Sequence, residues 1–144
     1  MTKTLTDPLV ALQKAQYATL STDADLLALG VKVFDHVNED HYPRVVIGED
    51  RESPEDMECE TFTEVFPTVR VYSRAVGKLQ AKEIAGHVRW LLDYSNGFTV
   101  EGFRLLSGHC INIDIHPHED ESTTQAELTF KYWVIPAPDV SPAS

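Results

Sequence analysis

Hydrophobic residues follow two different periods between residues 61 and 92. In TFTEVFPTVRVYS, Val65, Val69 and Val71 share one side of an extended chain, which is the period-two pattern of a half-buried strand. After Gly77 the apolar positions recur every three or four residues, and this spacing predicts a helix with one apolar face. These positions are Ala81, Ile84, Ala85, Val88, Leu91 and Leu92. A strand and a helix of this kind bury their apolar faces by packing together, so we predict helices laid on a sheet.

The chain before this stretch predicts two helices and two strands. Asp7 and Pro8 have the residue types of a helix N-cap and a first helical position. A short second helix follows, and Gly30 is typical of the left-handed residue just after a helix. Strands are predicted at 31–34 and 44–50, where β-branched residues are dense.

The chain after this stretch predicts three more strands. Asn-Gly and Glu-Gly pairs within residues 96–102 are typical of tight turns between short strands. Residues 109–118 alternate, and we expect their three isoleucines, Ile111, Ile113 and Ile115, to point inward. The partner strand at 126–136 has one apolar face, made of Leu128, Phe130, Tyr132 and Val134. The order predicts an α+β fold with a single mainly antiparallel β-sheet, on which two N-terminal helices and one long central helix pack.

Length and composition predict one domain over residues 1–136. A chain of 144 residues buries roughly two thirds of its unfolded surface. Hydrophobic residues make up 42% and charged residues 24%, which excludes general disorder. Residues 137–144 are rich in Pro, Ser and Ala without apolar periodicity, so we predict a flexible C-terminal tail. Because the sequence has no export signal and no apolar run of about 18 residues, we expect a protein made in the cytoplasm that has no membrane partner.

Acidic residues dominate the charge. Twelve Lys and Arg against 23 Asp and Glu give a net charge of −11, which argues against sequence-independent binding to DNA or anionic membranes. Seven of the twelve residues at 49–60 are acidic, and we interpret this run as a long acidic loop between two strands, with a role in an interface. The candidate interface residues are Glu49, Asp50, Arg51, Glu52, Glu55, Asp56, Glu58 and Glu60.

Three histidines near one strand end are the candidates for a metal site. His116 and His118 would share one face of a strand, as in cupin metal sites, and His109 lies nearby in the sequence. The cupin pattern also requires a Glu four or five residues after the second His, where this chain has Ser and Thr. Pro117 further indicates that the strand has ended. We therefore favour solvated histidines and predict no metal.

No other residues suggest catalysis or a cofactor. Cys110 follows His109 directly, and neighbouring strand residues face opposite ways, so the two cannot form a nucleophile–base pair. We expect Cys110 to be a small buried residue. The sequence has no P-loop, G-x-S-x-G, G-x-G-x-x-G or H-E-x-x-H motif. We therefore predict no catalytic residues and no cofactor.

Several pieces of the sequence together resemble a known family. They resemble the small tail-completion or tail-terminator proteins of long-tailed bacteriophages and gene transfer agents, a family long catalogued as a domain of unknown function. The pieces are PLVALQKAQYATLSTDADLLAL, VKVFDHV, VVIGED, TVRVYSRAVGKLQAKEIAGHVRWLL and FTVEGFRLL. The resemblance covers about residues 8–135, and VYSRAVGKLQAKEIAGHV is its most specific piece.

This resemblance implies a structural virion protein without catalysis. It implies an α+β subunit of a homohexameric ring that caps the head-proximal end of the tail tube and ends tube polymerisation. The implied partners are other copies of the chain, the tail-tube protein and the head-completion (stopper) protein. The implied location is the virion tail at the head–tail connection, after assembly in the bacterial host cytoplasm. DNA would pass through the ring without specific binding, since an anionic channel repels it.

Two other functions stay open at the level of sequence. One is a cytoplasmic metal-dependent enzyme built on His109, His116 and His118, which predicts stoichiometric bound metal. The other is a small acidic adaptor that binds a basic partner, which predicts a monomer whose affinity falls with salt. A tail terminator instead predicts a closed cyclic oligomer with heterologous interfaces.

Overall fold

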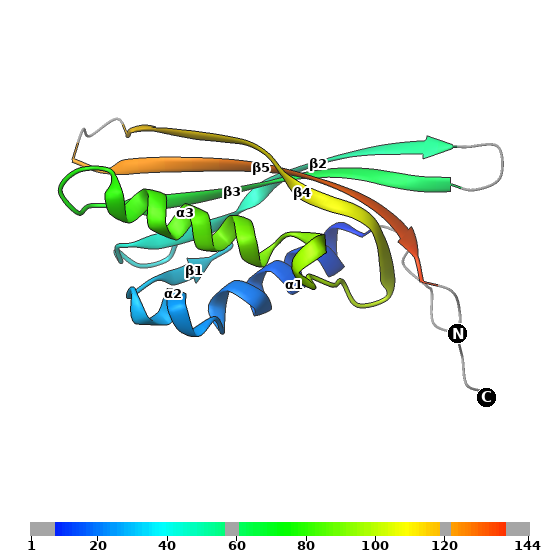
Figure 1. Cartoon of the computed structure of the whole chain (residues 1–144), viewed down its shortest axis with the longest axis horizontal. Helices are drawn as coiled ribbons and strands as arrows, with labels where there is room; N and C mark the ends of the chain where they lie inside the picture. The colour runs from blue at the N-terminus through cyan, green and yellow to red at the C-terminus, as the bar shows by residue number, and fades with distance from the viewer. Residues whose placement is uncertain (1–7, 57–60, 119–121, 138–144) are drawn as a thin grey trace.

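Five strands form one mixed sheet, and helices lie along one of its faces (Figure 1). The computed structural model describes residues 8–56, 61–118 and 122–137, and in the strands the side chains at 49, 51–56 and 61 are not described. The helices are α1 (Leu9–Ser21), α2 (Ala24–Ala28), α3 (Leu79–Leu91) and the 3-10 helix η1 (Tyr94–Asn96). The strands are β1 (Lys32–Phe34), β2 (Arg44–Asp56), β3 (Thr61–Ser73), β4 (Phe103–Pro117) and β5 (Thr124–Pro136). The predicted α+β class is confirmed.

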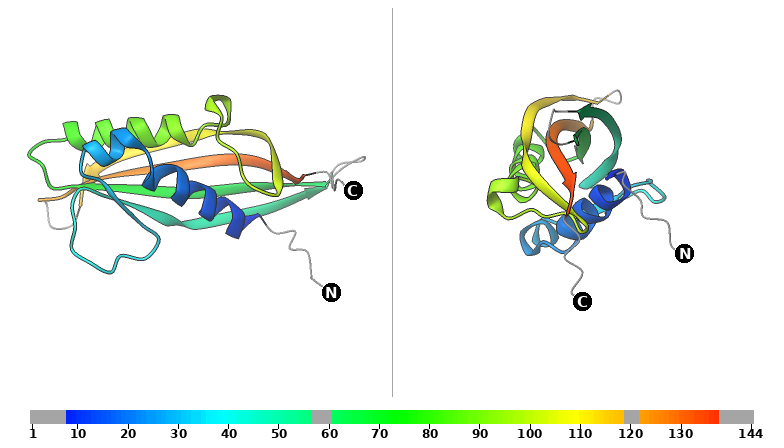
Figure 2. Two further views of the ribbon diagram at one scale, coloured as in Figure 1. Left: turned by 90° about the horizontal axis from the view of Figure 1, so that it is seen from below. Right: turned by 90° about the vertical axis from the view of Figure 1, so that its right-hand side faces the viewer.

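The strand order in the sheet is β1-β2-β3-β5-β4. β1 pairs with β2 in parallel, and every other pair is antiparallel, so the sheet is mainly antiparallel as predicted. Figure 2 shows that α1, α2 and α3 all lie on the same side of the sheet. The second face of the sheet therefore carries no helix in the described part of the chain.

The core lies between α3 and the middle of the sheet. The predicted apolar face of α3 is confirmed, because Ala81, Ile84 and Val88 have no exposed surface. On the sheet, the predicted inward residues of β3 and β5 are buried as well; they are Val65, Val69, Val71, Leu128, Phe130, Tyr132 and Val134. Burial of this many large apolar side chains, at about 1.5–3 kcal/mol each, holds the helix on the sheet.

The ends of the N-terminal helices follow local chemistry. Pro8 is the N-cap of α1, and the predicted cap Asp7 lies outside the described residues. Asp23 caps α2, since its carboxylate accepts a hydrogen bond from the Leu26 backbone N–H at 3.0 Å. Gly30 follows α2 with φ +80°, which is the predicted left-handed conformation.

The C-terminal part has two strands, so the prediction of three is wrong. Residues 98–100 form no strand, although Gly97 and Gly102 make the predicted turns with positive φ. A single strand of 15 residues, β4, instead runs from Phe103 to Pro117. Gly108 lies opposite Tyr132, whose ring fills the space that a side chain would occupy, so glycine belongs to the strand here.

The expected inward direction of the three isoleucines is only partly correct. Ile113 and Ile115 pack against the core, but Ile111 is 47% exposed. A register shift between Cys110 and Asn112 places Ile111 at a β-bulge, where one extra residue leaves the alternation. A bulge of this kind is not visible in the spacing of apolar residues.

The C-terminal end of the described chain is tied to the turn before β4. The backbone N–H of Ala137 donates to the carbonyl of Gly102 at 3.0 Å. The predicted flexible tail at 137–144 otherwise lies outside the described residues. Among the helices that the structure describes, none combines the length and the apolar character needed to cross a membrane.

Candidate functional site: assembly surfaces

The β2–β3 hairpin projects beyond the helical layer. β2 and β3 pair over their whole lengths, from Arg44 opposite Tyr72 to Asp56 opposite Thr61. β1 pairs only with the first three residues of β2, so β2 is an edge strand beyond Val46 in the described part of the sheet. Figures 1 and 2 show the two strands continuing past the ends of the helices. The hairpin is therefore an extended arm with one unpaired strand edge.

This arm corrects the prediction of an acidic loop at 49–60. Residues up to Asp56 are strand, because their backbone groups pair with β3, and this pairing does not depend on apolar side chains. Most candidate interface residues lie on this strand: Glu49, Asp50, Arg51, Glu52, Glu55 and Asp56. Glu58 and Glu60 lie outside the described residues. Sequence reasoning missed the strand because its pairing depends on β3 and not on local apolar residues.

The free edge of β2 has features that oppose strand-to-strand aggregation. Residues 49–60 carry seven acidic residues and one arginine, a net charge of −6. Pro54 removes one backbone donor, and a register shift between Gly48 and Arg51 bends the edge. Charge, proline and bulges are the usual means by which an edge strand avoids open-ended pairing. An interface made by this arm would thus use its charged side chains rather than added strands.

Asp50 lies within this bulge and is only partly exposed. Its Oδ1 atom is buried and has no hydrogen-bond partner among the described residues. Burial raises the pKa of the Asp50 carboxyl, because loss of hydration disfavours the ionised form. An acidic group held in this way is destabilising unless something outside the chain contacts it.

Two ion pairs link neighbouring strands on the helix-free face of the sheet. Arg70 on β3 and Glu127 on β5 form an ion pair at 2.9 Å. Glu64 forms an ion pair with Lys131 at 3.2 Å and accepts a hydrogen bond from the Trp133 Nε1–H at 2.8 Å. These pairs lie directly or diagonally across neighbouring strands, where opposite charges stabilise a sheet. Part of the charge on this face is therefore balanced within the chain.

Two arginines and two tyrosines pack together at the other end of this face. The Arg44 guanidinium lies 4.4 Å from the Tyr42 ring centroid and 5.2 Å from that of Tyr72. Arg74 lies 4.1 Å from the Tyr42 ring, and its Nε donates to Thr123 Oγ1 at 3.1 Å. Cation–π contacts of this kind attach the connection before β2 to the sheet. The cluster therefore has a clear structural role.

The three candidate metal ligands are not brought together. His109 lies opposite Lys131 and His116 lies opposite Gln125, six residues apart on β5, which corresponds to roughly 20 Å. His118 is held by a 3.0 Å hydrogen bond with Gln125 and by the Tyr72 ring. In the described ranges, no three His, Cys, Asp or Glu side chains are grouped closely enough to hold a metal ion.

Cys110 and His109 face opposite sides of β4, as predicted. Cys110 is buried, its Sγ contacts the Asn112 carbonyl oxygen at 3.4 Å, and burial raises the pKa of its thiol. His109 is exposed. A thiol that stays protonated and is turned away from the histidine cannot act as an activated nucleophile.

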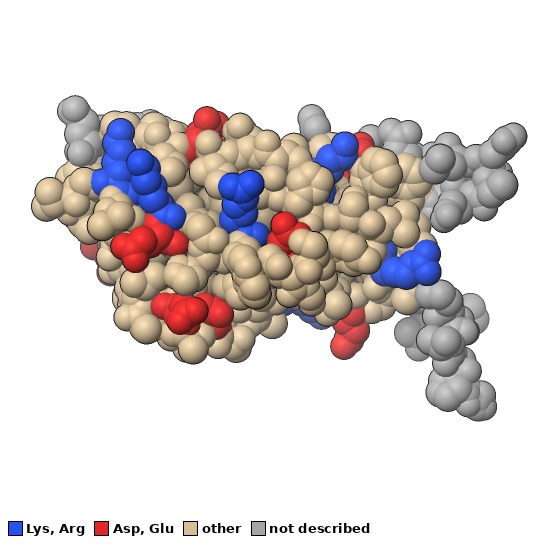
Figure 3. Space-filling view, in the orientation of Figure 1, with Lys and Arg blue, Asp and Glu red and all other residues tan. Residues whose placement is uncertain are grey.

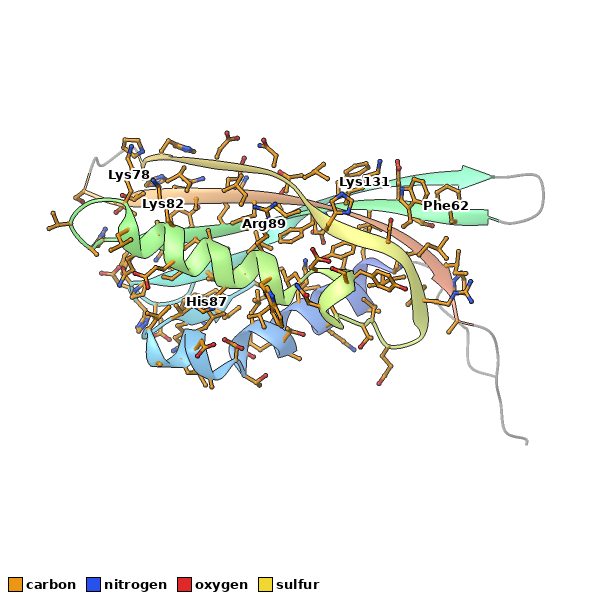
Figure 4. All side chains as sticks on the ribbon, viewed as in Figure 1. Phe62, Lys78, Lys82, His87, Arg89 and Lys131 are labelled. Carbon is orange, nitrogen blue, oxygen red and sulfur yellow. The ribbon has the colours of Figure 1, made fainter. Side chains whose placement is uncertain are left out.

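The outer face of α3 is a second candidate surface. Lys78, Lys82 and Arg89 follow one line along the helix, since they are four and seven residues apart. Figure 3 shows basic side chains gathered over the start and the middle of α3, and Figure 4 labels these three residues. Leu79 and Trp90 lie on the next line along the helix and are 71% and 60% exposed, so neither belongs to the core. Both fall outside the apolar spacing of the helix, and this was the signal available in the sequence.

Comparison with known proteins gives one family and a shared fold. The model of the family described as "Tail completion protein gp17" matches residues 14–135. A chain of the structure titled "Virion of native gene transfer agent (GTA) particle" is 24% identical, with a TM-score of 0.79, and the match covers 89% of this chain and 97% of that chain. The structure of the bacteriophage SPP1 gp17 protein is 20% identical, with a TM-score of 0.59 and coverage of 85% and 88%. Among curated proteins, none matches the sequence.

Proposed function

Since the chain belongs to the family of tail completion proteins called gp17, we propose that six copies form a closed ring at the head-proximal end of a tail tube. As a member of this family, the chain is a structural protein of the virion tail, and it is not an enzyme. The alternative of a metal-dependent enzyme built on His109, His116 and His118 is therefore wrong. In the proposed ring, the chain stops tube polymerisation and joins the tail to the head-completion protein of a phage or gene transfer agent.

The projecting β2–β3 arm is the observation that carries this proposal. A closed ring requires two different surfaces on each subunit, one that reaches out and one that receives. The arm extends past the helical layer and is the most strongly charged segment of the chain. We therefore propose that the acidic residues of β2 in this arm contact a neighbouring subunit or the tail-tube protein.

Net charge supports the proposed passage of DNA through the ring. Each subunit carries −11, so six copies form a strongly anionic assembly. Like charges repel, and a duplex in such a channel slides without adhering. Wild-type rings should accordingly show no binding of duplex DNA even in low-salt buffer, where electrostatic attraction is strongest. Tight binding at low salt would contradict this part of the proposal.

Native mass spectrometry with and without tail tubes tests the ring. We expect either a hexamer in the purified protein or a monomer that assembles on the ends of purified tail tubes from the same particle. Tubes incubated with the protein should also stop elongating when more tube subunits are added. A protein that stays monomeric and leaves tube growth unchanged would refute the proposed function.

A further inference from the structure

The basic side chains on the outer face of α3 differ from three other cations in the described chain. Lys32, Arg70 and Lys131 each pair with a carboxylate of the same chain, namely Glu39, Glu127 and Glu64. Lys78, Lys82 and Arg89 are exposed, and the described residues offer none of them an ion pair. Residues 78–91 have three cations and one carboxylate, so this helix has a charge of +2 in a chain of −11. A basic surface of this kind on an acidic protein is suited to an acidic partner.

On the surface of α3, Gly86 lies between the line of basic residues and the line formed by Leu79 and Trp90. It is exposed in the middle of the helix, and a Cβ atom built on it would have no heavy atom within 4 Å. Its backbone φ is not in the left-handed region, so neither packing nor conformation requires glycine within the chain. A glycine inside a helix costs about 1 kcal/mol relative to alanine. What it provides is a flat place where another backbone can approach closely.

We propose that this outer face of α3 receives the acidic β2–β3 arm of the neighbouring subunit in the ring. Lys78, Lys82 and Arg89 would face the acidic residues of β2, while Leu79 and Trp90 supply apolar contact area. The lengths match, because residues 78–89 of a helix and residues 51–56 of a strand both extend over about 17–20 Å. This inference rests on the proposed ring and names the two surfaces that close it.

The occupant is a second copy because the chain's own arm cannot reach this face. The inner face of α3 packs on its own sheet, and the arm continues past the helices and away from the outer face (Figure 4). A contact between an arm and a helix of different subunits is heterologous, so it repeats around an axis and forms a ring when the rotation closes, as the proposed function requires. Duplex DNA is the other anion that could lie on this helix, but exposed Leu79 and Trp90 suit a protein surface better.

Reciprocal charge reversal tests this pairing. The full-length variant Lys78→Glu/Lys82→Glu should shift the protein concentration at which half of the chains are in rings upward by at least tenfold, in native mass spectrometry alone or on tail tubes. Glu52→Lys/Glu55→Lys should raise this concentration in the same way, because it reverses charges on the arm that the helix would contact. Combining the four substitutions should bring the midpoint back to within a few-fold of wild type.

A matched control uses Lys14, an exposed lysine on α1 that is the only charged residue of its helix. Lys14→Glu makes half the charge change of Lys78→Glu/Lys82→Glu, and it should leave ring formation unchanged. Circular dichroism should show native folding of all variants, since every substituted lysine is exposed. Gly86→Gln is a second probe that keeps the charge and should also block ring formation.

The outcomes separate this inference from the proposed function. If wild-type protein forms no ring, alone or on tubes, then the proposed function and this inference both fail. If wild-type rings form and the α3 variants form them equally well, only this inference is overturned. If rings persist but Lys78→Glu/Lys82→Glu abolishes binding of a short DNA duplex, the helix serves DNA and this inference is also overturned. Rescue by the fourfold variant is the result that supports it.

Discussion

Gly108 on β4 and Gly86 on α3 both lack a side chain, but only the first is explained by its surroundings. A Cβ atom on Gly108 would lie 2.1 Å from Cδ1 of Tyr132, so the folded chain leaves no room for one. A Cβ atom on Gly86 would meet no atom within 4 Å. The first glycine is a requirement of the core. The second glycine lowers the stability of the folded subunit, and no contact within the subunit requires it. Its role is therefore to be sought in contact with a partner.

The same contrast separates the two exposed surfaces of the molecule. On the helix-free face of the sheet, the charges of Arg70 and Lys131 are met by carboxylates of the same chain. On the outer face of α3, the basic side chains are met by none in the described chain. Charges that are paired within the chain need no partner for their stability, whereas unpaired charges gain free energy when a partner with the opposite charge binds. The predictions below test this contrast residue by residue.

Replacing Gly108 by alanine should have the largest effect. The added methyl group cannot coexist with the Tyr132 ring, and this ring is held by its neighbours Phe98 and Phe130. We expect Gly108→Ala to lower the free energy of unfolding by about 3 kcal/mol, the upper range for overpacked cores. Urea denaturation followed by circular dichroism measures this change. A loss below that of an ordinary surface substitution would mean that Tyr132 moves easily and that Gly108 is no core requirement.

Tyr132→Phe separates the hydrogen bond of this residue from its packing. The buried Tyr132 hydroxyl donates to the Leu92 carbonyl at 2.6 Å. Removal of the hydroxyl keeps the aromatic ring and should lower the free energy of unfolding by about 1–2 kcal/mol at pH 7, because a buried acceptor is left without its donor. Urea denaturation of both proteins measures the difference.

The pH dependence of this variant provides a control. Burial raises the pKa of Tyr132 well above its usual value, so the folded wild type keeps its phenolic proton where the unfolded chain loses it. The resulting stability is present below about pH 10 and is lost as the pH rises through the folded pKa. The phenylalanine variant has no such proton, so its deficit should shrink above pH 10. A deficit that stays constant would show that Tyr132 does not titrate in this way.

Much of the covered half of the sheet could be predicted from the sequence. The spacing of Val65, Val69 and Val71, and of Ile84 and Val88, directly records which side faces the core. Local periodicity is informative there because every second or every third to fourth residue must be apolar for burial. This part of the fold was confirmed for that physical reason.

The arm and the bulges could not be predicted in the same way. Residues up to Asp56 form a strand because β3 lies beside them, and nothing in their own composition requires it. Ile111 points outward because of a bulge that depends on the register with β5. Gly108 is required by the ring of Tyr132, which lies 24 positions away in the sequence. Pairing between distant segments was the missing information.

The α3 surface was recognisable only in part. Lys78, Lys82 and Arg89 fall outside the apolar spacing of the helix, but a basic exposed face is common and carries little information alone. Its meaning depends on two facts from the structure. These are the missing ion-pair partners within the described chain and the open space around Gly86.

Gly86→Ala should move stability and assembly in opposite directions. Because the φ of Gly86 is compatible with alanine and its surroundings are open, we expect the subunit to become more stable by about 0.5–1 kcal/mol. Thermal unfolding of dilute protein measures this gain. Ring formation should become weaker in the same samples, because the methyl group lies where the neighbouring arm approaches. A variant that is more stable and assembles as well as wild type would remove the reason to connect Gly86 with a partner.

Asp50→Asn should have the smallest effect and extends the contrast to the arm. The buried Oδ1 of Asp50 has no partner among the described residues, so its charge is a cost in the isolated subunit. An amide of the same shape carries no charge, and we expect a gain of up to about 1 kcal/mol at pH 7 in urea denaturation. The raised pKa fixes the sign of the pH dependence. The folded wild type holds this proton more tightly than the unfolded chain, so its stability rises as the pH falls through the folded pKa towards about 4. The advantage of the asparagine variant should therefore shrink in acid. If the advantage instead grew in acid, or if the variant were less stable than wild type at pH 7, then the Asp50 carboxylate would be satisfied within the chain. Asp50 would then be a requirement of the folded subunit, as Gly108 is, and not a feature that points to a partner, as Gly86 does.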